Sequence, residues 1–171
     1  MVQLTKNFRL EEFLVSSTAD ARGIANTPTP EHEAHIREVL APGLQVIRDE
    51  LGVSILIMSA YRNPQVNHLV GGVPNSDHTE AYAADIRAAG LSAFALAKRV
   101  EAMMAPGGKL HGKVDQLILE TSRSVVHVGF APRKRAQILT QRGGPGTPFH
   151  PGIELESGGT GRPPPSPPPV P

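Results

Sequence analysis

Residues 59–85 constrain the fold and the chemistry of this chain more than any other stretch, because polar side chains gather there directly after an apolar run. Residues 53–58 form that run, and its three β-branched members after a glycine predict a buried β-strand. Arg62 follows the end of this strand, and His78 and Asp85 come later in the same stretch. Loops at the ends of strands commonly carry functional residues. We therefore interpret residues 59–85 as one half of a metal site.

Composition and charge exclude several classes of protein. The formal net charge is +1 with 19% charged residues, and no segment collects enough Lys or Arg to follow a phosphate backbone, so we expect no nucleic-acid partner. No segment reaches the roughly 18 apolar residues that span a bilayer, and the amino terminus lacks the apolar run of a signal peptide. We therefore expect synthesis in the cytoplasm without a signal peptide, no association with membranes, and a monomer.

The absence of cysteine limits the kind of metal site that this chain can form. Disulfides and thiolate ligands are excluded, so histidine and carboxylate must hold any transition metal. That ligand chemistry points to a hydrolytic site of the zinc type.

The carboxyl-terminal part of the chain differs in composition from the rest. Residues 143–171 contain 10 of the 17 prolines and 7 of the 17 glycines, with few apolar side chains. Such a segment buries too little apolar surface to offset the entropy of ordering it. We therefore predict a folded domain at residues 1–141 and a disordered tail at residues 142–171. The proline run at 163–169 is expected to be an extended spacer or a ligand for an aromatic groove.

The apolar spacing and the helix-breaking residues predict an alternation of helices and strands. Helices are expected at residues 8–14, 30–51, 63–70 and 91–104, with a last basic helix at 134–140. Pro42 and Gly43 are expected to kink or divide the second of these helices. Strands are expected at residues 53–58, 81–88, 114–120 and 124–130.

The last two strands are separated by a short polar turn, which predicts an antiparallel hairpin. If Ser122 and Arg123 are the central turn residues, Glu120 lies opposite Val125, and Ile118 lies opposite His127. The period of two along a strand then places Glu120 and His127 on one face of the hairpin.

His78, Asp85 and His127 are the candidate metal ligands. His78 and Asp85 can meet if His78 lies in a loop and Asp85 points inward from a strand, although a capping histidine and a salt-bridged aspartate would also explain them. His127 lies in an apolar strand, where an imidazole needs a partner, which a structural hydrogen bond would equally provide. Together the three make a set of two histidines and one carboxylate, which leaves a fourth tetrahedral position for water.

Hydrolysis at such a site also needs a base and a cation near the substrate. Glu120 is the candidate base, and the alternative is a glutamate exposed to solvent at the end of a strand. Arg62 is the candidate for binding a substrate carboxylate or the developing oxyanion, and the alternative is a structural ion pair.

Several motifs resemble those of the zinc D-Ala-D-Ala carboxypeptidase family, and in particular its phage-type branch that cuts peptidoglycan. They are Ser59-Ala60-Tyr61-Arg62-Asn63-Pro64-Gln65-Val66-Asn67, Val70-Gly71-Gly72, Asn75-Ser76-Asp77-His78, Ala83-Ala84-Asp85-Ile86 and Val126-His127-Val128. The resemblance extends over residues 5–130. It implies a small α+β domain of the hedgehog-like type, in which helices flank a central antiparallel sheet.

The same resemblance implies roles for individual residues. His78, Asp85 and His127 would bind Zn²⁺, Arg62 would hold the substrate carboxylate or the polarised carbonyl, and Ser76 would line the site. The chain departs from the family at two positions. Ala81 stands where glycine is common, a mild change if its φ is negative. Ser124 stands where many members have the acidic base, so Glu120 would replace that base.

These observations predict a zinc-dependent peptidase that hydrolyses stem or cross-link peptides of peptidoglycan. The absence of a signal peptide fits a phage lysis protein or a virion component that reaches the cell wall by another route. The alternative is a non-catalytic, zinc-containing module that either binds the cell wall or is a structural part of a virion.

Overall fold

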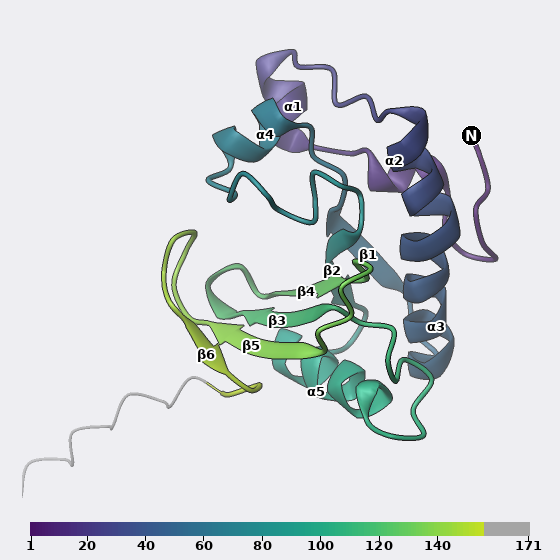
Figure 1. Cartoon of the computed structure of the whole chain (residues 1–171), viewed down its shortest axis with the longest axis vertical. Helices are drawn as coiled ribbons and strands as arrows, with labels where there is room; N and C mark the ends of the chain where they lie inside the picture. The colour runs from purple at the N-terminus through teal and green to yellow at the C-terminus, as the bar shows by residue number, and fades with distance from the viewer. Residues whose placement is uncertain (156–171) are drawn as a thin grey trace, which may run out of the picture.

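Within the residues that the computed structural model describes, 1–155, six strands form one sheet in the order β1-β2-β4-β3-β5-β6 (Figure 1). The strands are β1 (Ile55–Ser59), β2 (Ala83–Ala88), β3 (Gln116–Glu120), β4 (Val125–Gly129), β5 (Gln137–Gln141) and β6 (Phe149–Pro151). The α-helices are α1 (Ser17–Arg22), α2 (Pro30–His35), α3 (Ala41–Leu51), α4 (Pro64–Leu69) and α5 (Ala93–Met104). The predicted α+β class is confirmed.

The sheet is mixed, although most of its neighbouring strands are antiparallel. β3 and β5 form the parallel pair, and every other pairing in the sheet is antiparallel. The predicted register of the β3–β4 hairpin is confirmed, because Glu120 pairs with Val125 and Ile118 pairs with His127. This register places the side chains of the site on a single face of the sheet.

The basic helix predicted at residues 134–140 is wrong, because the chain forms strand β5 there. Lys134 and Ala136 have positive φ angles of 47° and 53°, which a right-handed helix does not allow. The backbone N–H of Gln137 donates to the carbonyl of Asp115 at 2.9 Å and starts the pairing with β3. The apolar and β-branched residues that follow suit a strand.

The folded part of the chain also continues beyond the boundary predicted at residue 141. β6 pairs with β5, and the hydroxyl of Thr140 donates to the carbonyl of Gly152 at 2.7 Å. Hydrogen bonds therefore order a segment that is too poor in apolar residues to form a core, which is why composition alone did not reveal it. The predicted disorder and the proline run of residues 156–171 lie outside the described residues.

The long helix predicted at residues 30–51 is present as α2, a π-helical segment η2 (Ile36–Leu40) and α3. Thr29 caps it by accepting a hydrogen bond from the backbone of His32, and Gly52 ends it with a φ of +68°. The expected irregularity lies in η2, before Pro42, because Pro42 has no N–H to donate to the preceding turn. Near the amino terminus the predicted helix is a 3₁₀ turn, η1 (Leu10–Phe13). In the described part of the chain, no helix combines the length and the apolar character required to cross a bilayer.

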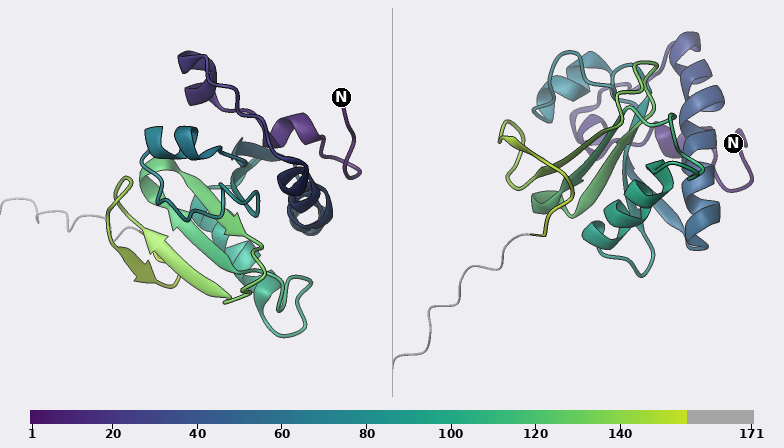
Figure 2. Two further views of the ribbon diagram at one scale, coloured as in Figure 1. Left: turned by 45° about the horizontal axis from the view of Figure 1, so that its top comes forward. Right: turned by 60° about the horizontal axis from the view of Figure 1, so that its bottom comes forward.

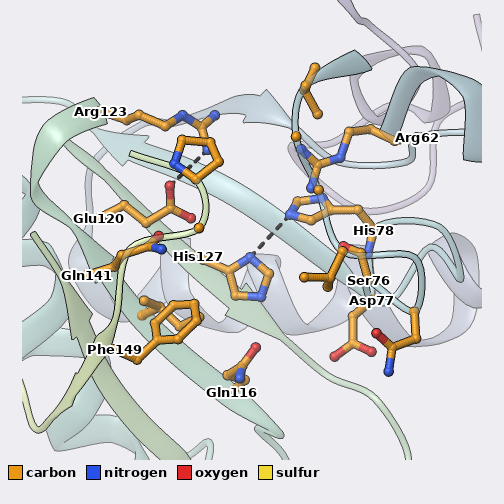
Figure 3. A pocket seen from close by; sticks show the side chains of 18 of the residues that line it. Arg62, Ser76, Asp77, His78, Gln116, Glu120, Arg123, His127, Gln141 and Phe149 are labelled. Atoms are coloured by element: carbon orange, nitrogen blue, oxygen red, sulfur yellow. Dashed lines mark hydrogen bonds and ion pairs between the residues drawn. The ribbon is translucent and has the colours of Figure 1, made fainter. Parts of the chain in front are cut away.

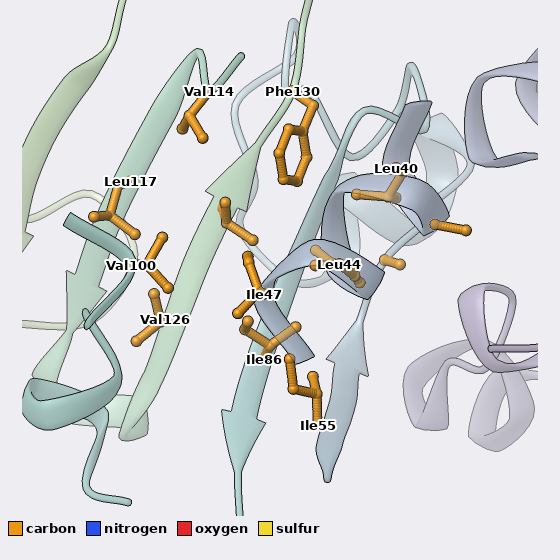
Figure 4. Packing of buried hydrophobic residues seen from close by; sticks show 14 of the residues in the cluster. Leu40, Leu44, Ile47, Ile55, Ile86, Val100, Val114, Leu117, Val126 and Phe130 are labelled. Carbon is orange, nitrogen blue, oxygen red and sulfur yellow. The ribbon is translucent and has the colours of Figure 1, made fainter. Parts of the chain in front are cut away.

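The hydrophobic core lies between one face of the sheet and the helices α3 and α5 (Figure 4). Ile86 and Val126 are paired neighbours on that face and are fully buried. Leu44 of α3 and Val100 of α5 pack into the same cluster. Alternation along β2 and β4 turns the intervening side chains toward the opposite face. Figure 2 shows the same arrangement from two further directions, with α4 and its following loop beside the opposite face.

Strand β1 was predicted to be buried, but it lies at the edge of the sheet. Leu56 is 59% exposed and Met58 is 44% exposed, whereas Ile55 is buried. The apolar run therefore identified a strand correctly but overstated its burial, because an edge strand with one covered face leaves alternate apolar side chains in solvent.

Candidate metal centre

Three elements place the candidate ligands on the sheet face opposite α3 and α5. Asp85 lies on β2 directly opposite His127 on β4. His78 lies in the loop between α4 and β2, and its imidazole faces that of His127 (Figure 3). All three side chains are buried. The predicted arrangement, a loop histidine beside an inward-facing strand aspartate, is therefore present.

The three ligand atoms are close enough together to share one ion. His78 Nε2 lies 3.2 Å from Asp85 Oδ1 and 3.1 Å from His127 Nδ1, and His127 Nδ1 lies 3.1 Å from Asp85 Oδ1. Ligands about 2.0–2.1 Å from a tetrahedral ion lie about 3.3 Å from one another. The three atoms therefore match one face of a tetrahedron, and this group can hold a metal ion.

The surroundings of His78 prepare its imidazole for metal binding. Nδ1 lies 2.7 Å from the carbonyl oxygen of Ala60, so Nδ1–H donates there and the lone pair of Nε2 faces the other two ligands. Burial lowers the pKa of His78, against the opposing effect of Asp85, and so favours the neutral form that binds metals. The backbone N–H of Arg62 donates to the carbonyl of His78 at 3.1 Å, which ties this loop to the end of β1.

Asp85 is held in its ionised form. Burial would raise the pKa of this carboxyl, but the adjacent imidazoles of His78 and His127 bring the pKa well below its usual value. Its second oxygen, Oδ2, accepts a hydrogen bond from Arg123 Nη1 at 3.0 Å. Both oxygens of Asp85 are thus oriented, one toward the ligand group and one toward a guanidinium.

Glu120 lines the same cavity at the end of β3. Its side chain is 14% exposed, so it is not the solvated strand-end glutamate of the alternative interpretation. Burial and the negative charge of Asp85 raise the pKa of Glu120, and Arg123, 2.9 Å from Oε2, opposes that shift. A raised carboxyl pKa suits a group that both accepts and returns a proton.

Arg62 is buried beside the ligand group, and no carboxylate among residues 1–155 forms an ion pair with it. Its Nε has no hydrogen-bond partner in that part of the chain. Burial lowers the pKa of its guanidinium, while the charge of Asp85 acts in the opposite direction. The alternative of a structural ion pair is therefore not what the structure contains, and the guanidinium remains available to an anion.

A cavity of about 410 Å³ opens over the ligand group, a size typical of binding sites for small ligands. Ser76 lines it, and its hydroxyl oxygen accepts the backbone N–H of His78 at 3.3 Å. Arg62, Glu120 and both histidines line it as well. The cavity therefore brings together every residue that the sequence predicted for the site except Asp85, whose side chain lies beneath the two imidazoles.

The sequence interpretation missed several further residues of the cavity, among them Arg123, Gln116, Gln141 and Phe149. The period of two along β3 would have identified Gln116, which lies on the same face of the strand as Ile118 and Glu120. Arg123 was named only as a turn residue. Gln141 and Phe149 lie at or beyond the predicted end of the domain.

The two positions at which the chain departs from the family pattern have clear local structures. Ala81 has a φ of +61°, so the backbone there is left-handed and the replacement of glycine is a strained change rather than the mild one expected. Ser124 has a φ of +50°, is exposed, and does not line the cavity, whereas Glu120 does.

Comparison with known proteins agrees with this geometry. A family model described as Peptidase M15 matches residues 6–128, which is more than two thirds of the chain. No curated protein matches the chain. The match includes all three candidate ligands, Arg62 and Glu120, and it ends within β4.

Proposed function

The chain belongs to the peptidase M15 family, whose members are metal-dependent, and on that premise we propose that it is a zinc peptidase that hydrolyses stem or cross-link peptides of peptidoglycan. The observation that carries the proposal is that one cavity lies over two histidines and a carboxylate and also contains a glutamate of raised pKa and an arginine that has no acidic partner in the described part of the chain. These groups supply metal binding, proton transfer and recognition of an anion in one cavity.

His78, Asp85 and His127 would hold the ion. When bound, zinc supplies a coordinated water of lowered pKa and a Lewis acid for the carbonyl of the scissile amide. Burial of the three ligands keeps competing solvent away from them. Two buried imidazoles and a carboxylate lie within 3.2 Å of one another. A cation bound between them would satisfy the lone pairs of all three.

Glu120 is assigned the proton transfers. As a carboxylate it accepts a proton from the attacking water, and as a carboxylic acid it returns that proton to the amine that leaves. Its raised pKa brings the two forms closer in free energy near neutral pH. Arg123 holds Oε2 of Glu120 and thereby limits the positions that this carboxylate can occupy.

Arg62 is assigned to the substrate. A guanidinium presents paired N–H donors that match both oxygens of a carboxylate. Because Arg62 is buried and lacks an acidic partner within residues 1–155, a substrate carboxylate would complete its hydrogen bonding. We therefore assign it to the carboxylate on the carboxyl side of the scissile bond, and Ser76 to the adjoining cavity surface.

The site of action follows from the substrate. Peptidoglycan lies outside the cytoplasm, and we propose that the protein acts on the cell wall as a phage lysis protein or as a virion component. Digesting purified peptidoglycan with the zinc-loaded protein and identifying the new amino terminus would establish which peptide bond is cut.

The test of the enzymatic proposal is Glu120→Gln in the full chain, with hydrolysis of peptidoglycan and bound zinc measured together. We expect hydrolysis to fall by about 10²–10⁴-fold with zinc retained, because the amide keeps the shape of the side chain but cannot accept the proton. If the parent protein binds zinc and cell walls but releases no new amino termini, the chain is instead a binding module without catalysis.

A further inference from the structure

The family match ends at residue 128, but residues beyond it also line the cavity. Residues 133–149, which we call the β5–β6 wall, contribute Arg133, Arg135, Gln141, Thr147 and Phe149 to the cavity lining. Figure 3 shows Phe149 near Gln116 and Gln141 near Glu120, its partner in the β3–β5 pairing, both on the far side of His127 from Arg62. A segment outside the family pattern thus forms one side of the site.

Ion pairs fix the β5–β6 wall to the loop that carries His78. Arg133 pairs with Asp77, the neighbour of His78, and its Nη2 also lies 3.1 Å from Asp115 Oδ2. Arg135 binds both oxygens of Asp115, with Nε to Oδ1 at 3.0 Å and Nη2 to Oδ2 at 2.7 Å. The fully buried carboxylate of Asp115 thus anchors the start of the wall.

The farther part of the wall is tied to itself. Gln141 Nε2 donates to the carbonyl of Thr147 at 3.0 Å, and the backbones of Gln141 and Phe149 are paired between β5 and β6. These bonds close the hairpin over the sheet face that carries the site. Hydrogen bonds and strand pairing therefore hold the wall in a defined position over the site.

The topology places this wall and Arg62 on opposite sides of the ligand group. Arg62 follows β1 at one edge of the sheet, whereas β5 and β6 form the other edge. The ligands Asp85 and His127 lie on β2 and β4 between these edges. If Arg62 binds the carboxyl side of the scissile bond, the part of the substrate on the amino side must extend toward the β5–β6 wall.

The two sides of the cavity also differ in charge. Within residues 1–155 no carboxylate pairs with Arg62, whereas Arg133 and Arg135 are neutralised by Asp77 and Asp115. Phe149 is 50% exposed, so half of an aromatic ring is available to a ligand, and Gln141 adds an amide beside it. This side therefore favours apolar contact and amide hydrogen bonds over ion pairing.

We propose that the β5–β6 wall binds the peptide segment on the amino side of the scissile bond, with Phe149 packing against an aliphatic side chain and Gln141 contacting the peptide backbone. This inference rests on the proposed function, and it makes Phe149 and Gln141 determinants of specificity. The substrate is then an extended peptide rather than a free dipeptide.

Equilibrium binding tests the inference separately from hydrolysis. The zinc-loaded Glu120→Gln full-length protein is titrated with acetyl-D-Ala-D-Ala and with Nα,Nε-diacetyl-L-Lys-D-Ala-D-Ala, which adds one uncharged aliphatic residue on the amino side. We expect the longer peptide to bind about tenfold more tightly, and the preference to persist at high salt, because its origin is apolar contact.

Adding Phe149→Ala should remove most of this preference and leave the affinity for the shorter peptide unchanged. Leu155→Ala is the matched control, since Leu155 is also an exposed apolar residue but does not line the cavity. The inference would be overturned if the two peptides bound equally well, or if the preference disappeared at high salt. It would also be overturned if Phe149→Ala lowered the affinity for both peptides by the same factor. Hydrolysis by the parent protein is measured in parallel, so a preference without cleavage contradicts only the proposed enzyme.

Discussion

Arg123 Nη1 lies 3.0 Å from Asp85 Oδ2, on the side of that carboxylate opposite to the two imidazoles. The same nitrogen lies 2.9 Å from Glu120 Oε2. One guanidinium thus orients the predicted acidic ligand and the predicted base together. Its side chain is 40% exposed, so solvent screens its charge, and its geometric effect on Asp85 matters more than its net charge.

Arg123→Ala should therefore weaken zinc binding. Loss of a group that orients a metal ligand typically costs about 10–100-fold in affinity, and we expect a loss within that range. Competition with a chromophoric chelator measures it. Arg99→Ala, which removes an exposed arginine from α5, is the control and should leave the affinity unchanged. Unchanged affinity in Arg123→Ala would show that Asp85 is oriented without it.

Zinc should stabilise the folded chain through His78. A ligand that binds only the folded state adds about 4 kcal/mol when its concentration is a thousand times its Kd. Thermal unfolding with excess zinc and with EDTA should therefore differ in Tm for the parent, and His78→Ala should abolish the difference. His150→Ala, which removes an exposed histidine from β6, should preserve it. A zinc-dependent Tm in His78→Ala would contradict the assigned ligand group.

The candidate ligands were predictable because their residue types and their spacing along the strands can both be identified from the sequence alone. His127 stands out as an imidazole within an apolar strand, and the period of two places Glu120 on the same face. Arg123 could not be inferred in this way. Its contact with Asp85 depends on the 3₁₀ turn Thr121–Arg123, which folds the guanidinium back toward β2.

The carboxyl-terminal strands were missed for a different reason. Apolar periodicity detects elements that bury a hydrophobic face, but β6 is ordered mainly by backbone pairing with β5 and by bonds to Thr140. The start of β5 depends on Asp115, which lies far away in sequence and holds Arg135. Contacts of this kind leave no local pattern. The cavity wall that they build was therefore absent from the prediction.

Asp115 should make stability depend on pH in the acidic range. Burial would raise its pKa, but hydrogen bonds and charge from Arg135, with Arg133, lower it below the usual value. A lowered folded pKa stabilises the fold above the unfolded pKa of about 3.9, and this contribution is lost as the pH falls through the folded value. Asp115→Asn should thus lower Tm at pH 7. Below pH 4 the difference in Tm between this variant and the parent should become smaller. The measurement uses zinc-free protein in EDTA, so that metal binding does not contribute, and a constant gap from pH 7 to pH 3 would contradict the prediction.

Ser124→Gly should stabilise the chain, because Ser124 adopts a left-handed backbone with a φ of +50° at the end of the 3₁₀ turn. That conformation costs an L-residue about 1–2 kcal/mol, whereas glycine adopts it freely but loses about 0.5–1 kcal/mol through its more flexible unfolded state. The expected net gain is about 0.5–1 kcal/mol in the free energy of unfolding, measured by urea denaturation. Ser124→Ala is the matched control, since it removes the exposed hydroxyl but retains the strain and should give no such gain. Equal stability of the glycine and alanine variants would show that the turn relaxes without cost, and an altered zinc affinity in Ser124→Gly would show that this turn also sets the position of Arg123.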